Sequence, residues 1–214
     1  PAALQAGTAG NSTIYTNNTS AKVSISAPGT QGWLSNFQYR KKIIFNNSAI
    51  SENLVNFSVP IIFNSSNTDF WGHVQTNGND TRFVDADNTT ELYYEFETFN
   101  HTSDDMVAWV KVRQIDASST TDYIWIYYGN STVNFDSYST LSSNAWDSNY
   151  VVVYHFKDVS GSKMTDSTLK NNATLYGGGS HWTNGQIGGA YNFDGTNDYA
   201  IINASIAFDV STYT

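Results

Sequence analysis

One apolar run in the C-terminal half of the chain constrains the possible fold most. Residues 151–156 read Val-Val-Val-Tyr-His-Phe, and the residues directly before them, Asp147, Ser148 and Asn149, are typical of turns. β-Branched and aromatic side chains favour strands, and a strand that is apolar at successive positions needs cover on both faces. Residues 145–156 therefore form a seam, at which one β-rich part of the chain ends and another begins.

Short strands are predicted at close intervals on the N-terminal side of this seam. They are residues 39–45, 54–63, 82–84, 91–99, 107–112 and 123–129. No helical period of comparable strength separates them, and strands without intervening helices favour an antiparallel arrangement. We therefore expect an all-β fold, an antiparallel β-sandwich or jelly roll in two units, with residues 31–147 in the first unit and residues 148–214 in the second.

Residues 1–30 are expected to form an N-terminal tail rich in Gly, Thr, Asn and Ser. Residues 22–27 alternate like a strand, and Pro28 and Gly29 end this pattern. The second unit is shorter than a complete jelly roll, so that either the chain is an excerpt of a longer protein or a strand from another copy completes the sheet. If residues 22–27 are that donor strand, copies would join head to tail into an open assembly such as a filament.

Charge and cysteine content exclude several classes of function. Charged residues make up 14% of the chain and the net charge is −9, whereas nucleic-acid binding depends on clustered Lys and Arg. The chain has no Cys, which excludes disulfides and thiolate metal sites. No apolar run reaches the length of a membrane-spanning helix. We expect no nucleic-acid partner and no membrane-spanning segment in this chain.

Asn-x-Ser/Thr sequons recur along the whole chain and indicate its compartment. They begin at Asn11, Asn17, Asn18, Asn46, Asn56, Asn64, Asn79, Asn88, Asn100, Asn130, Asn172 and Asn203. A chain rich in Asn, Ser and Thr contains some sequons by chance, but these lie mostly next to predicted turns, which suits a glycosylated outer surface. We therefore expect an extracellular, glycosylated cell-surface protein. The absence of Cys is ordinary for prokaryotic surface proteins, and archaea use the same sequon, which favours an archaeal source.

An ordered set of motifs resembles a known family. The motifs are Trp33 with residues 39–43, then residues 82–87, 94–97, 108–112 and 126–130. Together they resemble, over about residues 33–147, the domain of unknown function that lies upstream of laminin-G-like domains in archaeal and bacterial surface proteins. That family has no established catalytic residues, so the resemblance implies none here.

The residues beyond the seam resemble the start of a concanavalin/laminin-G-like jelly roll, over about residues 150–214. The motifs are residues 153–156, 166–168, 171–175, 188–190 and 193–199. The resemblance implies a β-sandwich that often binds glycans and sometimes Ca²⁺. Asp166 and Asp194 are its predicted calcium ligands, because carboxylate oxygens suit this ion, although tight turns also use Asp. Trp182, in a Gly-rich stretch, is the predicted sugar-binding residue.

Glu95 and Glu97 are the residues that would suit catalysis best. They share one strand face, as two carboxylates of glycosidases do, but a half-buried strand also places Glu on its solvent face. The third acidic residue and the inward Trp of jelly-roll glycosidases are missing from the pattern, so no catalytic residue is predicted. The four His residues lack zinc spacing, and His155 in its apolar run is expected to be a hydrogen-bonded core or edge side chain.

These inferences favour a non-enzymatic, glycosylated extracellular surface or filament protein with a structural and adhesion role. Its expected partners are other copies of itself in an open assembly, other surface proteins, and glycans. The alternative is a carbohydrate-binding, lectin-like module of a larger secreted protein, and a glycosidase fragment ranks third.

Overall fold

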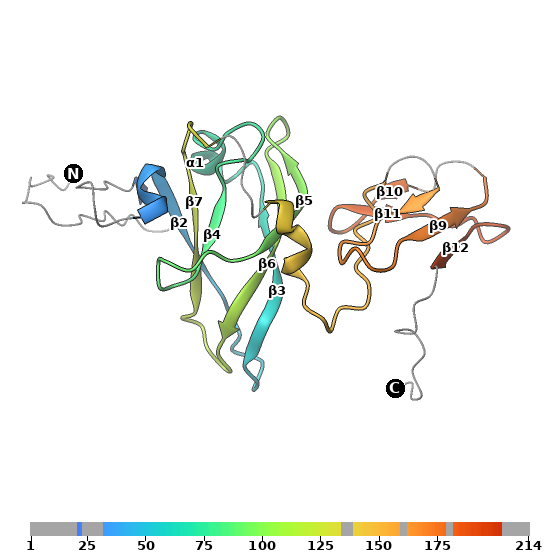
Figure 1. Cartoon of the computed structure of the whole chain (residues 1–214), viewed down its shortest axis with the longest axis horizontal. Coiled ribbons are helices and arrows are strands. Elements are labelled where there is room, and N and C mark those ends of the chain that lie inside the picture. The colour runs from blue at the N-terminus through green and yellow to red at the C-terminus, as the bar shows by residue number, and fades with distance from the viewer. Residues whose placement is uncertain (1–20, 23–31, 134–138, 159–161, 179–181, 203–214) are drawn as a thin grey trace, which may run out of the picture.

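The computed structural model describes residues 21–22, 32–133, 139–158, 162–178 and 182–202. Two sheets in the N-terminal part of this range face each other (Figure 1). The first has the strand order β1-β2-β7-β4, formed by Ala21–Lys22, Tyr39–Ile44, Tyr123–Tyr128 and Arg82–Val84. The second has the order β3-β6-β5, formed by Leu54–Phe63, Asp105–Ile115 and Tyr94–Asn100. All of these strand pairs are antiparallel, which confirms the predicted all-β sandwich.

Alternation along the strands creates the core between these two sheets. On β7, Ile124, Ile126 and Tyr128 are fully buried in this core, together with inward residues of β6 such as Met106 and Val110. A side chain of this kind contributes about 1.5–3 kcal/mol when it is fully removed from water. Burial of this one face fixes the register, because a slip by one residue would turn the apolar set outward.

The opposite face of β7 has a core of its own. Trp125 and Tyr127 are buried there with Leu34 and Phe37, which belong to or follow the 3₁₀ helix η1 (Gly32–Asn36). The guanidinium of Arg40 lies 4.0 Å from the centre of the Trp125 ring and adds a cation–π contact. The remaining helical elements of the described residues are α1 (Thr68–Trp71) and the 3₁₀ helix η2 (Ser139–Ala145).

The outer face of the second sheet positions the candidate site. On β5, Tyr94 and Phe96 pack in or against the core, and a register shift occurs between Phe96 and Thr98. Glu95 and Glu97 therefore lie on the outer face, beside Trp109 of β6. The helix η2 contacts this sheet through both β5 and β6, and its last residue, Ala145, accepts a hydrogen bond from Ser58 of β3.

The C-terminal strands form two smaller sheets beside β5 (Figure 1). One has the order β12-β9-β8, formed by Tyr199–Ile202, Ala173–Tyr176 and Lys163–Met164, and the other is the hairpin of β10 (Trp182–Asn184) and β11 (Gly189–Tyr191). Their core contains three buried side chains, Met164, Ala173 and Leu175, in the described part of the chain. The predicted jelly-roll topology and the predicted division into two units stay predictions.

The apolar run of the seam does not form a regular strand. Within residues 151–156 only Tyr154 makes a ladder contact, an isolated bridge to Asp166. Side chains bind two further backbone groups: Val153 N donates to Asp166 Oδ1 at 2.8 Å, and Asn171 Nδ2 donates to the carbonyl of Val151 at 2.8 Å. The backbone N–H of Ser167 donates to the carbonyl of Val153 at 2.9 Å. The segment is therefore held by side chains and single backbone contacts instead of by a regular strand pairing.

Part of the predicted tail strand is visible. Ala21–Lys22 pairs with β2 of the same chain, with Ala21 opposite Arg40 and Lys22 opposite Tyr39. Residues 23–27 lie outside the described residues, as does the rest of the predicted tail up to residue 20. The donor-strand role of residues 22–27 stays a prediction.

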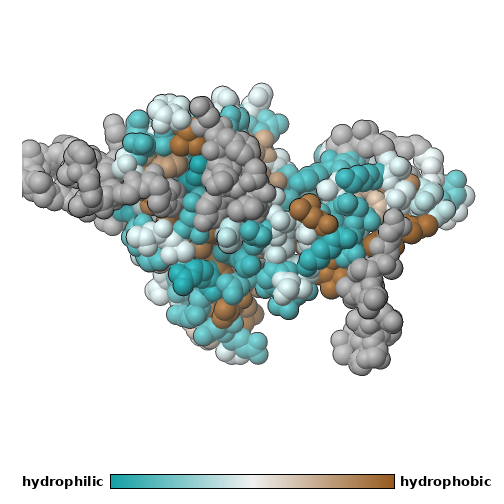
Figure 2. All heavy atoms as spheres, in the orientation of Figure 1, coloured by the Kyte–Doolittle hydropathy of each residue, from teal (hydrophilic) through white to brown (hydrophobic). Residues whose placement is uncertain are grey.

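The surface in Figure 2 is mostly hydrophilic, with apolar residues in separate patches. Large exposed apolar side chains occur on both sheet systems, for example Val55 on β3 and Ile201 on β12. Among the described residues, no helix combines the length and the apolar character that crossing a membrane requires.

Candidate functional site

Glu95 and Glu97 lie in the interface between the N-terminal sandwich and the C-terminal sheets. Only 8% of the Glu95 side chain and 4% of the Glu97 side chain are exposed, so neither belongs to a solvent-facing strand surface. Burying two carboxylates on one strand is unfavourable unless donors and positive charges surround them. The C-terminal segment supplies those groups.

His155 lies between the two carboxylates. Its Nε2 is 3.3 Å from Glu95 Oε2 and its Nδ1 is 3.2 Å from Glu97 Oε2. Only the protonated imidazolium can donate from both ring nitrogens. Burial by itself would lower the pKa of His155, but the hydrogen bonds to Glu95 and Glu97 and their negative charges outweigh it and raise the pKa above the ordinary value. His155 is a hydrogen-bonded, buried side chain, as its sequence context predicted.

Glu95 is saturated with donors. Trp146 Nε1 donates to Oε2 at 2.8 Å, and Oε1 accepts hydrogen bonds from Ser167 Oγ at 2.8 Å and Lys157 Nζ at 3.1 Å. Burial would raise the pKa of Glu95, but the bonds from His155 and Trp146 and the charges of His155 and Lys157 lower it to about 2. Glu95 is therefore a fixed anion that connects β5, the end of η2 and the C-terminal segment.

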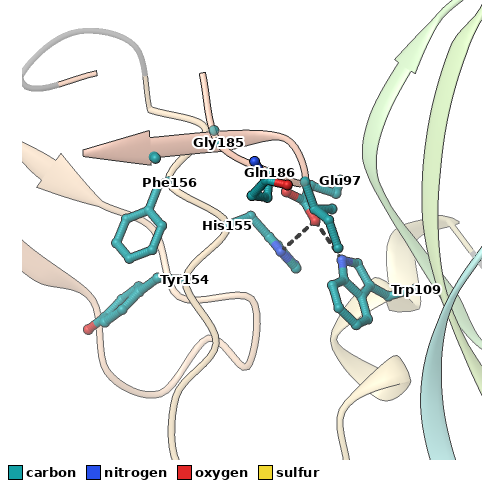
Figure 3. Close-up of a pocket in the computed structure, with 10 residues that line it drawn as sticks. Glu97, Trp109, Tyr154, His155, Phe156, Gly185 and Gln186 are labelled. Carbon is teal, nitrogen blue, oxygen red and sulfur yellow. Dashed lines mark hydrogen bonds and ion pairs between the residues drawn. The ribbon is translucent and has the colours of Figure 1, made fainter. Parts of the chain in front are cut away.

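Glu97 is bound at one oxygen only. Its Oε2 accepts a hydrogen bond from Trp109 Nε1 at 2.6 Å and faces His155, as the dashed lines in Figure 3 show. Its Oε1 accepts no hydrogen bond from the described residues. The rings of Trp109 and Trp146 pack against His155, with centroid distances of 5.9 and 5.6 Å, and shield these charges from water. We call Glu95, Glu97, His155, Trp109 and Trp146 the junction cluster.

Two glycines bring the β10–β11 hairpin against the junction cluster. A Cβ atom at Gly188, where φ is +59°, would lie 1.9 Å from Glu97 Oε1. A Cβ atom at Gly189 would lie 2.3 Å from the carbonyl oxygen of Phe156. Another residue at Gly189 would displace backbone, and one at Gly188 would displace the Glu97 carboxylate or the hairpin, so Gly188 and Gly189 permit this close approach.

An open pocket of about 370 Å³ remains between the hairpin and the outer face of the second sheet. One side of it is lined by Glu97, Trp109, Tyr154, His155 and Phe156, and the other by the hairpin residues Gly185, Gln186, Ile187, Gly189 and Ala190. Figure 3 shows the side chains of His155 and Trp109 converging on Glu97, while Tyr154 and Phe156 lie farther along the C-terminal segment. The pocket is therefore mostly aromatic and apolar, with a charged pair at one end.

The two predicted calcium ligands lie in different settings. Asp166 is fully buried, and its two oxygens accept hydrogen bonds from the backbone N–H groups of Val153, Thr168, Lys170 and Asn171 and from the Thr168 hydroxyl, at 2.6–3.1 Å. These bonds outweigh burial and lower the pKa of Asp166. Asp194 is exposed in a turn, where its Oδ1 accepts from Thr196 N at 2.7 Å.

Asp166 thus organises the loop that it begins, in the manner of an Asx turn. Within the part of the chain that the structure describes, no group of three or more His, Asp or Glu side chains is arranged to hold a metal ion. Calcium binding by Asp166 and Asp194 stays a prediction.

The predicted sugar-binding residue, Trp182, begins β10 and is 36% exposed. Its indole nitrogen lies 2.9 Å from the position of a Cβ atom at Gly189, so it packs against the hairpin that closes the pocket. Trp182 is next to the pocket but does not line it. Its role in sugar binding stays a prediction.

The described sequons differ in access. The exposed ones are Asn46, Asn56, Asn64, Asn88, Asn100 and Asn172, whereas Asn79 is half-buried. Asn130 is only 4% exposed, and its side-chain oxygen accepts hydrogen bonds from the backbone and hydroxyl of Thr132 at 3.1 and 2.8 Å. Asn130 is therefore the least accessible of the described sequons. Asn11, Asn17, Asn18 and Asn203 lie outside the described residues.

The sequence pattern places Glu95 and Glu97 on one strand face but does not bring His155 to them. Nor does it identify Trp109 and Trp146 as donors to the two carboxylates. One sequence feature does indicate a partner. Two Glu residues on one strand face need a cationic partner if that face is buried, and cationic residues are few in this chain. The distance of about 60 residues between β5 and His155 hides this pairing from any local pattern.

Comparison with known proteins gives one match. The family model described as "Domain of unknown function (DUF2341)" matches residues 77–185. This range begins and ends later than the range of 33–147 over which the resemblance was expected, and it contains every residue of the junction cluster and the hairpin up to Gly185. No curated protein and no solved structure matches the chain.

Proposed function

We propose that this chain, which belongs to the DUF2341 family, is a non-enzymatic structural and adhesion module of an extracellular surface or filament protein. The observation that carries the proposal is the junction cluster. Its buried charges bind the C-terminal sheets to the outer face of the sandwich, and the family match includes both sides of this contact. A fixed angle between neighbouring sheet systems is what a load-bearing or spacing module requires.

The electrostatics favour a structural role over glycoside hydrolysis. A glycosidase needs one carboxyl group that holds its proton near neutral pH, which a raised pKa provides. Here the pKa of Glu95 is lowered to about 2, and each of its oxygens accepts hydrogen bonds from neighbouring side chains. Glu97 Oε2 is likewise occupied by Trp109 and His155. Glu95 is therefore arranged to stay charged, and both carboxylates are held in place by these bonds.

An extracellular, glycosylated location is the second part of the proposal. Six of the sequons lie on exposed positions of the described chain, which N-glycans require. The chain has no Cys and few charges, in keeping with a prokaryotic and specifically archaeal surface protein. The resemblance to a region upstream of laminin-G-like domains, and of the C-terminal sheets to the start of such a jelly roll, supports the same setting.

The partners proposed are other copies of this chain in an open assembly and other surface proteins. Strand donation by residues 22–27 would join copies head to tail. Removal of residues 1–30 tests this part, because assembly in the source organism should then stop. Unchanged assembly by the shortened protein would exclude donation by the tail.

The junction can be tested with paired spin labels, since the chain has no Cys of its own. Labels on Cys at the exposed positions Thr120 and Asn197 report the distance between the sandwich and the C-terminal sheets. One narrow distance distribution is expected, and it should broaden in Trp146→Ala but not in Trp182→Ala. A broad distribution in the unmodified sequence would contradict a fixed junction.

Native protein tests the location. Glycopeptide mass spectrometry of protein from the source cells should find glycans at most of the exposed sequons and the lowest occupancy at Asn130. Bare Asn at nearly all of them, or protein confined to the cell interior, would exclude the extracellular assignment.

The second candidate is the lectin-like module, and the aromatic pocket beside the junction cluster favours it. Saturable binding on a glycan array would support this candidate. A purely structural subunit should show none.

A further inference from the structure

We propose that the pocket between the β10–β11 hairpin and the outer face of the second sheet is a subsite for one neutral sugar residue of a glycan. The subsite would give the lectin-like candidate its ligand, and it rests on that candidate for its biological setting. Its chemistry follows from the pocket itself.

The pocket has the size and the walls of a small-molecule site. Its volume of about 370 Å³ falls in the lower part of the range of about 300–1,000 Å³ that such sites occupy. Trp109, Tyr154 and Phe156 supply aromatic surface, and Ile187 and Ala190 of the hairpin supply aliphatic surface. A pyranose ring has apolar C–H faces that pack on aromatic rings, while its edge carries hydroxyl groups.

Glu97, at the polar end of the pocket, has one carboxylate oxygen without a hydrogen bond from the described residues. Its side chain is only 4% exposed, yet its Oε1 accepts no hydrogen bond from the described residues, whereas Oε2 is bound by Trp109. A carboxylate buried to this extent normally has all of its oxygens hydrogen-bonded. Because Glu97 lines the pocket, a ligand hydroxyl in the pocket could donate the missing bond.

Charge selects a neutral ligand. The negative charges of Glu95 and Glu97 are matched by the positive charges of His155 and Lys157, which contact them at 3.1–3.3 Å. An anionic or cationic ligand would bring a charge for which this matched set leaves no opposite charge, which is unfavourable beside apolar walls. The pocket therefore fits a hydroxyl-rich, uncharged ligand better than an ammonium or carboxylate group.

Backbone geometry at the pocket wall indicates a strongly determined site. Phe156 adopts φ of +51°, a left-handed conformation that is uncommon for a residue with a bulky side chain. Such conformations persist where surrounding contacts fix them, and they concentrate at functional sites. The ring of Phe156 is fixed by Tyr191, with a centroid distance of 5.1 Å, so that this wall is held in place before any ligand binds.

The test uses the indole N–H signal of Trp109 in a ¹H–¹⁵N spectrum of the chain, identified with a Trp109→Phe variant. The probes are the methyl glycosides of glucose, galactose, mannose and N-acetylglucosamine, with glucuronate and glucosamine as charged analogues. We expect at least one neutral glycoside to shift the signal saturably, with a Kd in the range of about 1–10 mM. The charged analogues should bind at least about tenfold more weakly.

Variants locate the binding. Ala190→Phe fills the pocket without removing a hydrogen bond of the junction cluster and should abolish the shift. Tyr199→Ala removes an exposed aromatic residue outside the pocket and should keep the shift. If Ala190→Phe does not fold, Ile187→Trp at the exposed rim narrows the mouth instead and should weaken binding.

Three results would overturn the subsite. They are no saturable shift with any glycoside, binding that persists in the folded pocket-filling variant, or binding of glucosamine or glucuronate as tight as that of the neutral sugars. Each leaves the structural role standing, because that role is judged by the spin-label distances. A broad distance distribution together with sugar binding at Trp109 would instead exclude the structural role and leave the subsite.

Discussion

At the scale of single residues, His155 determines whether the junction is stable. A buried ion pair gains little over an apolar contact, but removal of one partner leaves an uncompensated charge in the interior. Among the described residues, His155 is the side chain that forms ion pairs with both Glu95 and Glu97. The neutral imidazole can donate to only one of them, so the contact between the sheets depends on its proton.

The first prediction concerns His155 and alkaline pH. Its folded-state pKa lies above the ordinary value of 6.5, so its stabilisation is complete below about pH 6.5 and is lost as pH rises through the raised pKa. His155→Gln should destabilise the protein by about 3–5 kcal/mol at pH 6 and should remove most of the change in stability between pH 6 and 9. Urea unfolding at both pH values measures this.

His73→Gln is the matched control, because the His73 side chain is 36% exposed. It should keep the pH dependence of the unmodified protein. If the stability of His155→Gln depended on pH as strongly as that of the unmodified protein, the charged state assigned to His155 would be wrong.

The second prediction concerns Glu95 and acid pH. Its folded-state pKa of about 2 lies below the ordinary value of 4.5, so its stabilisation is present above pH 4.5 and is lost as pH falls toward 2. This corresponds to about 3 kcal/mol. Glu95→Gln should lose this amount at pH 7 and show a flatter acid dependence in denaturant unfolding. Glu52→Gln, at an exposed position, should behave like the unmodified protein, and an acid dependence equally steep in both variants would refute the assignment.

At the scale of elements, the β10–β11 hairpin depends on glycine for two separable reasons. Gly188 needs a left-handed φ of +59°, and it also needs the absence of a Cβ atom that would lie 1.9 Å from Glu97 Oε1. Gly195 has a comparable φ of +74° but open space around it. The pair of sites therefore separates backbone strain from steric exclusion.

The third prediction uses this pair. Gly195→Ala should cost about 1–2 kcal/mol from backbone strain alone. Gly188→Ala should cost more, because the hairpin must move off Glu97, and it should also change the environment of the Trp109 indole. Denaturant unfolding and the Trp109 signal measure the two effects. Equal costs with an unchanged Trp109 signal would show that the hairpin does not pack on Glu97.

Elements with local alternation could be predicted from the sequence, and those that depend on distant side chains could not. The run that became β6 alternates between the core and the outer face, whereas β7 is buried on both faces. The β-branched and aromatic residues of both runs are enough to identify strands. Residues 151–156 looked equally strand-like, but Asp166 and Asn171 take their backbone partners. Glu95 and Glu97 were recognised as one strand face, whereas their burial depends on His155 and Trp146, which no local pattern connects to them.

At the scale of the whole molecule, the two sheet systems differ greatly in their cores. The sandwich buries a continuous cluster that includes Phe70, Phe83, Ile126 and Tyr128, all fully buried. The described C-terminal sheets bury only Met164, Ala173 and Leu175 in theirs. Apolar burial is the main favourable term in folding, so the C-terminal sheets need the junction for much of their stability.

The last prediction follows from this difference and concerns hydrogen exchange. Backbone amides of β6 and β7 should exchange only through global unfolding, whereas those of β9 and β12 should exchange through local opening at lower free energy. Trp146→Ala removes a ring that packs on His155 and a donor to Glu95, and should speed exchange in β9 and β12 by at least about tenfold. It should leave β6 and β7 slower than β9 in every case, because their core does not include Trp146.

Mass-spectrometric exchange at neutral pH measures both regions in one experiment, and Trp182→Ala on the hairpin is the control. If the amides of β6 and β7 were protected from exchange no better than those of β9 and β12, and lost the same protection in Trp146→Ala, the two sheet systems would unfold as one cooperative unit. The junction would then be part of a single core.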